Sequence, residues 1–210
     1  MLAGMSSLKV LELDGCLQLT GYSLQFLACG VASLEILGLS FCHNIRNPSF
    51  KKSRKGPGLG GVTKLNISSN SIYDDGLRCI LLAMPKLRSL ELRSCPNLTT
   101  QGFLYISAHG DILNEIDVSM SPRLTNSGCQ FLLSVPNLKK LSVHRCRHIT
   151  SRSTRGINAT TSPGISELNI GATEIGEKGI RRLSEVSVTT KERVRCSLVL
   201  TTPIHDMTVC

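Results

Sequence analysis

The residues in this chain that are best suited to chemistry lie between positions 144 and 148, which read His-Arg-Cys-Arg-His. Two imidazoles and a thiol are ligands that zinc accepts in proteins. A structural zinc site needs four ligands, however, and no second cluster of His and Cys follows at a suitable spacing. The neighbouring Arg145 and Arg147 also repel a cation. The sequence therefore predicts no metal site here.

A second chemical possibility is Cys42 beside His43, the pair closest to a nucleophile and its base. A reactive thiol has to be exposed and to have a low pKa, whereas the repeat described next places Cys42 in the core. No pair of carboxylates recurs where strand geometry brings both to the floor of a cleft. We expect no catalytic residue, no cofactor and no enzyme activity.

The elements that position these residues come from a repeat of the form Leu-x-x-Leu-x-Leu-x-x-Cys with a period of roughly 26 residues. Complete copies begin at Leu8, Leu34, Leu87 and Leu138, and looser copies at Val62, Leu113 and Ile165. The register is continuous from residue 8 to residue 173. Such a period is the signature of a solenoid built from stacked units.

Each unit of the repeat predicts one short strand followed by one helix. The apolar residues two positions apart share one face of the strand, and that face is buried only when neighbouring units stack into a parallel sheet. A Thr then precedes helical apolar spacing, as at Thr20, Thr99 and Thr125, and reads as a helix N-cap. We expect an α/β leucine-rich-repeat solenoid of about seven repeats, a curved parallel sheet with helices on its convex face.

A structural corner residue closes each strand, and a small side chain suits its tight turn. The clearest corner residues are Cys16, Cys42, Asn70, Cys95 and Cys146. We expect the cysteines among them to act as small buried hydrophobes.

This pattern resembles the cysteine-containing class of leucine-rich repeats, known from the F-box/leucine-rich-repeat family that selects substrates for cullin-based ubiquitin ligases. The resemblance covers residues 6–183, with the four corner cysteines on the family's cysteine position. It implies a substrate-recognition role. The family's F-box is absent from these 210 residues, so ligase components are implied as partners only if an F-box lies upstream, and the chain fits a fragment or a short isoform.

The segment 98–150 is also similar to the ciliary branch of that family, which belongs to the axonemal nexin-dynein regulatory complex. Its Gln101-Gly102, Tyr105-Ile106 and Ile116-Asp117 carry this similarity. The similarity implies a structural subunit of the axoneme as the alternative function.

Composition narrows the classes of partner and compartment. No apolar run is long enough to cross a membrane and no secretory signal begins the chain, which favours the cytoplasm or nucleus, with the axoneme as the alternative.

Nine cysteines at regular spacing favour reduced thiols. The formal charge of +9 is partly a basic run at 51–55, which reads as a solvated loop, with a nuclear-import signal or an anionic docking loop as alternatives. We expect no nucleic-acid partner, because no aromatic platform accompanies the basic residues.

Three regions are expected along the chain. Residues 1–7 read as the remnant of a preceding helix, which leaves an uncovered edge on the first strand. Residues 8–183 form the repeat domain, and residues 184–210 form a C-terminal cap and tail that includes a strand-like piece at 194–200.

The remaining function is protein binding, through outward strand positions on the concave face and the rim just beyond them. The candidate residues are Glu12, Asp14, Phe41, His43, Glu91, Arg93, Asp117, Met120, His144, Arg145 and Arg147. Arg and large apolar side chains dominate interface energetics, so Phe41, Arg93, Met120 and Arg145 are the expected anchors.

Overall fold

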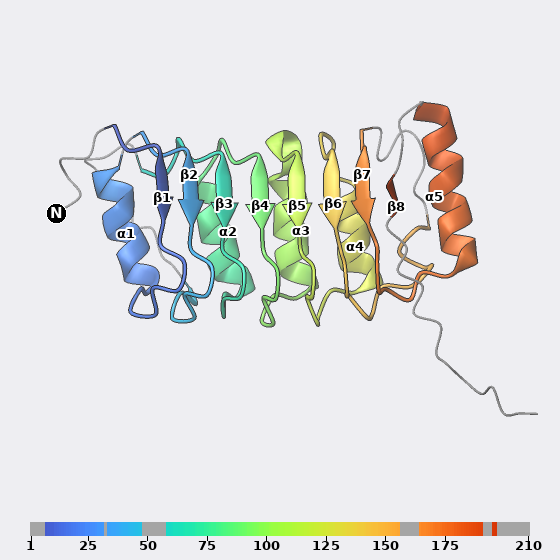
Figure 1. Ribbon diagram of the computed structural model, residues 1–210, viewed down its shortest axis with the longest axis horizontal. Helices are drawn as coiled ribbons and strands as arrows, with labels where there is room; N and C mark the ends of the chain where they lie inside the picture. Colours follow the sequence, from blue (N-terminus) through green and yellow to red (C-terminus); the bar gives the residue numbers. More distant parts are fainter. Residues whose placement is uncertain (1–6, 32, 48–57, 156–163, 191–194, 197–210) are drawn as a thin grey trace, which may run out of the picture.

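The computed structural model describes residues 7–31, 33–47, 58–155, 164–190 and 195–196. Its strands form one parallel sheet of eight, in the order of the chain. Figure 1 shows them side by side as a ladder. The strands are β1 (Val10–Glu12), β2 (Ile36–Gly38), β3 (Lys64–Asn66), β4 (Ser89–Glu91), β5 (Glu115–Asp117), β6 (Lys140–Ser142), β7 (Glu167–Asn169) and β8 (Arg195–Cys196). The expected parallel sheet is confirmed.

The register of the sheet follows the repeat. The central inward residue of each strand pairs with the equivalent residue of the next, as Leu65 does with Leu90 and Leu90 with Ile116. All three are buried, so the sheet and the apolar core are built by the same residues. Because side chains alternate along a strand, the residues on either side of these positions face outward.

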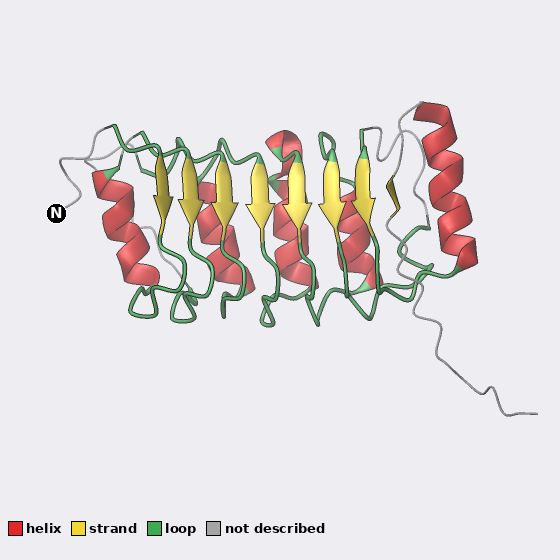
Figure 2. Ribbon diagram, viewed as in Figure 1, coloured by secondary structure: helices red, strands yellow, loops and turns green. Residues whose placement is uncertain are grey.

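Helices cover one face of the sheet and leave the other open (Figure 2). They are α1 (Gly21–Gly30), α2 (Asp74–Ala83), α3 (Thr100–Ala108), α4 (Asn126–Leu133) and α5 (Glu177–Thr190), with a short 3-10 helix η1 (Gly110–Ile112). Thr99 Oγ1 accepts the Gln101 N–H at 3.3 Å, and Thr125 Oγ1 accepts the Gly128 N–H at 3.2 Å. Both threonines are N-caps as predicted, and Thr20 occupies the same position before α1.

Two repeats show no helix within their described residues, and in both of them part of the connection, residues 48–57 and 156–163, lies outside those residues. Between β2 and β3, and between β6 and β7, the described residues form only turns. In the second case the Ser153 and Thr154 hydroxyls donate to the carbonyls of Thr150 and Ser151 at 2.9 and 3.0 Å, a local bonding pattern that competes with helix. The basic run at 51–55 lies outside the described residues.

The corner residues tie each repeat to the one before it. Asn70 Nδ2 donates to the carbonyl of Leu39 at 2.7 Å, Cys95 Sγ to that of Ile67 at 3.5 Å, and Cys146 Sγ to that of Val118 at 3.4 Å. Cys42 makes the equivalent bond to Leu13 at 3.2 Å. These four residues are buried as predicted. Burial raises the pKa of both Cys95 and Cys146 to about 11.

Cys16, by contrast, is exposed, so its prediction as a buried corner residue is wrong. The reason is the uncovered edge of β1, where no described residue supplies the carbonyl that the other corner residues bond. Leu11 and Leu13 are accordingly only partly buried. Among the described residues, β1 is the first strand of the sheet and has no strand on its other side.

At the other end of the sheet, α5 continues past Leu183, where we expected the last helical spacing to stop, to Thr190. β8 lies within the predicted strand-like piece and pairs with β7 in parallel. The rest of the expected cap and tail, residues 191–194 and 197–210, lies outside the described residues. No helix among the described residues is both long and apolar enough to span a membrane.

Candidate protein-binding surface

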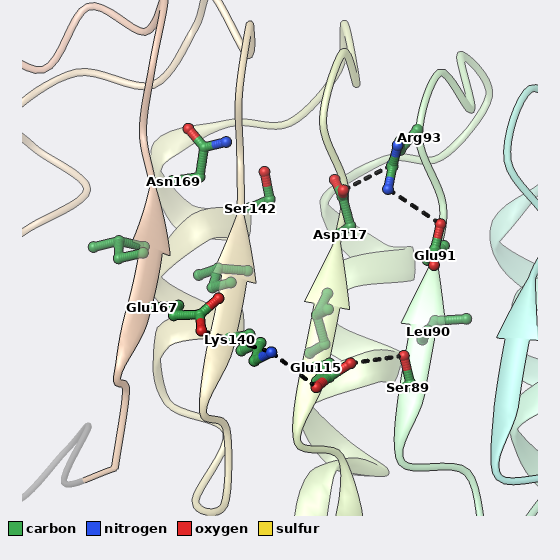
Figure 3. Close-up of a pocket in the computed structure, with 13 residues that line it drawn as sticks. Ser89, Leu90, Glu91, Arg93, Glu115, Asp117, Lys140, Ser142, Glu167 and Asn169 are labelled. Atoms are coloured by element: carbon green, nitrogen blue, oxygen red, sulfur yellow. Dashed lines mark hydrogen bonds and ion pairs between the residues drawn. The ribbon is translucent and has the colours of Figure 1, made fainter. Parts of the chain in front are cut away.

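The open face of the sheet carries a shallow central hollow over β4, β5, β6 and β7, with a volume of about 400 Å³ (Figure 3). Its polar lining residues are Ser89, Glu91, Arg93, Glu115, Asp117, Lys140, Ser142, Glu167 and Asn169. A smaller hollow of about 190 Å³ over β1 to β4 includes Glu12 and Asp14. Ser89 and Glu91 line both, so the two hollows are adjacent along the concave face.

Each cation in the central hollow is shared between two carboxylates. Arg93 Nε lies 2.7 Å from Asp117 Oδ2, and a terminal Arg93 nitrogen lies 3.2 Å from Glu91 Oε2. Lys140 Nζ lies 3.5 Å from Glu115 and 3.6 Å from Glu167, and these carboxylates, Glu115 first, raise the pKa of Lys140. Carboxylates outnumber cations in this hollow by two, so its floor is acidic although the chain as a whole is basic.

Four of these polar lining residues escaped the sequence analysis: Ser89, Glu115, Lys140 and Glu167. They are the first residues of their strands, two positions before the outward residues that end the same strands, such as the candidates Glu91 and Asp117. The signal was available, because alternation along a strand turns both positions to the same face. Glu115, Lys140 and Glu167 carry half of the charged groups that line the hollow.

Some outward polar side chains serve the backbone at the strand ends. Oδ1 of Asn66, Asp117 and Asn169 each accepts the N–H two residues later, at 3.1, 2.9 and 3.1 Å. Asp14 Oδ1 accepts the Ser40 N–H of the next repeat at 2.7 Å. Two of our candidate binding residues, Asp14 and Asp117, therefore have structural roles as well.

The rim beyond the strands is built on left-handed backbone. Phe41, Ser69, Ser94, Met120, Arg145 and Ala172 have φ between 54° and 59°. Each directly precedes a corner position, and Gly15 with φ of 73° takes that place in the first repeat. A residue with a side chain pays roughly 1–2 kcal/mol for this conformation. Gly15 is the only residue in this row whose type, read from the sequence, indicates a left-handed backbone.

Large side chains at these rim positions project into solvent. Phe41 is 56% exposed and Met120 is 43% exposed, and Arg145 is also exposed. Their backbones are fixed, because the N–H groups of Phe41, Met120 and Arg145 donate to the carbonyls of Ser68, His144 and Gly171 in the next repeat, at 2.8 to 3.0 Å. The rim thus holds exposed anchors on rigid turns.

The candidate residues fall into four groups along the face, with Met120 by itself after β5. Glu91, Arg93 and Asp117 meet in the central hollow. His144, Arg145 and Arg147 lie at the end of β6, and Glu12 and Asp14 lie at β1. Phe41 and His43 lie at the end of β2, where their rings pack edge to face with centroids 6.4 Å apart.

The two clusters considered for chemistry are split by the fold. Cys146 is buried, while His144 is half-buried and His148 is exposed. No three potential ligands among the described residues are grouped to hold a metal ion. Cys42 is buried as predicted, and burial raises the pKa of its thiol, which is the opposite of what a nucleophile needs.

Comparison with known proteins agrees with this architecture. Residues 62–81, which include β3 and most of α2, match the family model described as Leucine Rich repeat. This segment matches one leucine-rich repeat, and the sheet repeats the same unit along the described chain. This match lies in one of the looser copies of the sequence repeat, where Asn70 replaces the corner cysteine.

A solved structure shares the leucine-rich-repeat fold of this chain. The crystal structure of the Rad7 and Elc1 complex in yeast contains a chain with a TM-score of 0.61 and 17% identity, matched over 77% of our chain. The match covers 42% of that chain, so our protein spans less than half of its length. At this identity the likeness shows the fold alone. Leucine-rich-repeat solenoids present extended concave binding surfaces, which is where the hollows lie.

Proposed function

We propose that this leucine-rich-repeat protein is a non-catalytic interaction module that binds another protein through its concave face and rim. The observation that carries the proposal is the open face of the sheet, which has an acidic hollow over β4 to β7 and exposed Phe41, Met120 and Arg145 on rigid turns after β2, β5 and β6. Exposed apolar and Arg side chains on a fixed backbone lose little entropy on binding, which favours their use as anchors.

Within that role, we propose that the chain is the substrate-recognition part of a receptor for an SCF-type ubiquitin ligase. The resemblance of its cysteine-containing repeats to the F-box/leucine-rich-repeat family supports this proposal. The fold shared with Rad7, which was solved in complex with Elc1, is consistent with it. Such a receptor acts in the cytoplasm or nucleus, and an F-box upstream of these repeats would bring it to the ligase.

The alternative is a permanent structural joint in the axonemal nexin-dynein regulatory complex. It is supported by the similarity of segment 98–150 to the ciliary branch of the family. The same concave surface serves both functions, and the partners that it holds distinguish them.

The experiment is affinity purification of the native gene product, with one blocked variant and one matched control. Ser142 lies in the central hollow and its hydroxyl bonds the Ser119 hydroxyl at 2.8 Å. Ser107 lies in α3 and its hydroxyl bonds the Ser134 hydroxyl at 3.2 Å. Ser142→Arg and Ser107→Arg therefore remove one similar bond each, and only the first fills the concave face.

Copurified proteins are then identified by mass spectrometry. Cullin and its adaptor, together with a substrate that is lost in Ser142→Arg and retained in Ser107→Arg, support the ligase receptor. Axonemal regulatory proteins in the same pattern support the structural joint. If every specific partner survives Ser142→Arg and is lost in Ser107→Arg, binding uses the helical face and the proposal is wrong.

A further inference from the structure

The turns that follow β5 and β6 carry a cluster that we call the basic rim: Arg123, His144, Arg145, Arg147 and His148. All three arginines are exposed. They make no ion pair with any described residue, unlike Arg93 and Lys140 in the central hollow, which are each held by two carboxylates. Their charges are therefore uncompensated within the described part of the chain.

The repeat register brings these side chains together. Met120 and Arg145 occupy equivalent positions in neighbouring repeats, and the Met120 N–H donates to the carbonyl of His144 at 2.8 Å. Neighbouring strands lie roughly 4.8 Å apart, so residues one repeat apart are adjacent on the surface. Arg123 and His148 are equivalent in the same way. Figure 1 shows the turns below β5 and β6 next to each other, at the same edge of the sheet.

The backbone conformation at this edge of the sheet does not favour the residue types found there. Met120 and Arg145 both have φ of 57°, a conformation that Gly and Asn adopt at lower cost. Met120 in addition leaves apolar surface in water. The Ser94 hydroxyl donates to the Met120 sulfur at 3.7 Å, which is a weak contact. Local costs that the chain itself offsets only in part are typical of a functional surface.

We propose that the basic rim binds an acidic segment of the partner protein, with the partner's carboxylates on Arg145 and Arg147 and an apolar side chain against Met120. This inference rests on the proposed function and names the chemistry of its partner. Arginine forks bind carboxylates with two parallel hydrogen bonds, and a polar contact beside an apolar anchor is the usual composition of an interface.

The surroundings favour a peptide over nucleic acid. Base stacking relies mainly on the large aromatic side chains, and no Phe, Tyr or Trp lies in the turns after β5 and β6; among the residues equivalent to Met120 the nearest is Phe41, three repeats away. The neighbouring Glu174 is exposed in the turn before α5, and its carboxylate makes no ion pair with the described arginines. The acidic floor of the central hollow, on the other side of the rim, would keep an acidic segment at the edge of the sheet.

The test uses a fluorescent 12-residue peptide of Glu and Asp with one central Leu, with its binding to the full chain measured by anisotropy. Arg145→Ala with Arg147→Ala removes two charges from the basic rim. The matched control, Lys86→Ala with Lys139→Ala, removes two exposed charges just before β4 and β6, at the opposite ends of the strands. We expect the rim variant to lose about ten-fold in affinity, or about 1.4 kcal/mol, and the control to lose less than about two-fold. Met120→Ala should weaken binding without changing its salt dependence.

Equal losses in the two double variants would show that only the overall charge attracts the peptide, and would overturn the inference. So would tighter binding of a single-stranded oligonucleotide, or of a serine-phosphorylated peptide without carboxylates, since each is a different class of ligand. Absence of peptide binding by the unmodified chain would overturn it as well. If Ser142→Arg still abolishes capture of the partner by affinity purification, the proposed function stands although the peptide does not bind. The failure of this inference is therefore distinguishable from the failure of the proposed function.

Discussion

The Arg93 guanidinium bridges two neighbouring strands, with its Nε 2.7 Å from Asp117 Oδ2 at the end of β5 and a terminal nitrogen 3.2 Å from Glu91 Oε2 on β4. Half of the Arg93 side chain remains exposed, and exposed ion pairs contribute roughly 0–1 kcal/mol to stability. Arg93 is therefore less available to a partner than the unpaired Arg145, and its charge partly neutralises the floor of the hollow.

Replacing Arg93 by Ala should lower the free energy of unfolding by less than about 1 kcal/mol. It should also leave Glu91 and Asp117 unpaired, and thereby strengthen the attraction of the hollow for cationic groups. Urea denaturation at low and high salt measures the first effect, with Arg93→Lys as the control that keeps the charge. A loss above about 2 kcal/mol would show that the network is structural.

The corner thiols predict how stability responds to alkaline pH. Burial raises the pKa of Cys95 from 9.0 to about 11, so between these values the unfolded chain ionises while the folded chain keeps its proton. The contribution of this thiol is complete below pH 9 and is lost as the pH rises towards 11, by at most about 1.4 kcal/mol per pH unit.

The measurement compares the unfolding free energy of wild type and Cys95→Ala at pH 7, 9 and 10.5. We expect the gap between the two proteins to narrow as the pH rises. A constant gap would mean that Cys95 ionises equally in both states.

The uncovered edge of β1 should make the solenoid weaker there than at its centre. Leu90→Ala removes a side chain that is fully buried and should cost about 2–5 kcal/mol, as large cavities in packed cores do. Leu11→Ala changes the equivalent but only partly buried residue of β1 and should cost less than half as much. Hydrogen exchange of the two strands in the unmodified chain gives an independent comparison, since β1 should exchange faster than β4.

The left-handed backbone at Met120 predicts that a substitution there can raise stability while it weakens binding. Met120→Asn places a residue that tolerates φ of 57° and removes exposed apolar surface, so stability should rise by about 0.5–1 kcal/mol. Partner affinity should fall. Ser69→Asn is the matched control, because Ser69 has φ of 57° at the same position two repeats earlier and carries no large side chain. Equal affinity in both variants would remove Met120 from the interface.

The spacing of leucines was enough to predict the parallel sheet and the burial of Cys42, Cys95 and Cys146, because stacking leaves only one way to bury the inward residues. It did not predict the turns at residues 151–155, where the Ser153 hydroxyl donates to the carbonyl of Thr150. The spacing also predicted burial for Cys16, which is exposed. Burial of a corner residue depends on contact with the neighbouring repeat, which the residue's own repeat does not reveal.

The sequence predicted which side chains lie on the candidate surface, but not which of them form ion pairs with one another. Alternation identified Glu91, Arg93 and Asp117 as outward residues, and the structure shows that they bond one another. Side-chain reach across strands depends on rotamers that a repeat pattern does not contain. The left-handed turns under Phe41 and Met120 were likewise hidden, because only Gly15 among the equivalent residues reveals that conformation by its type.

The most direct test of the account is hydroxyl-radical footprinting of the native complex beside the free chain. Four exposed side chains report on two faces: Phe41 and Met120 on the rim, and Tyr22 and Phe26 on α1, which are 72% and 76% exposed. The account predicts that bound partner protects Phe41 and Met120 from oxidation by several-fold and leaves Tyr22 and Phe26 unchanged. Protection of the α1 pair with full oxidation at the rim would contradict binding through the concave face and its rim.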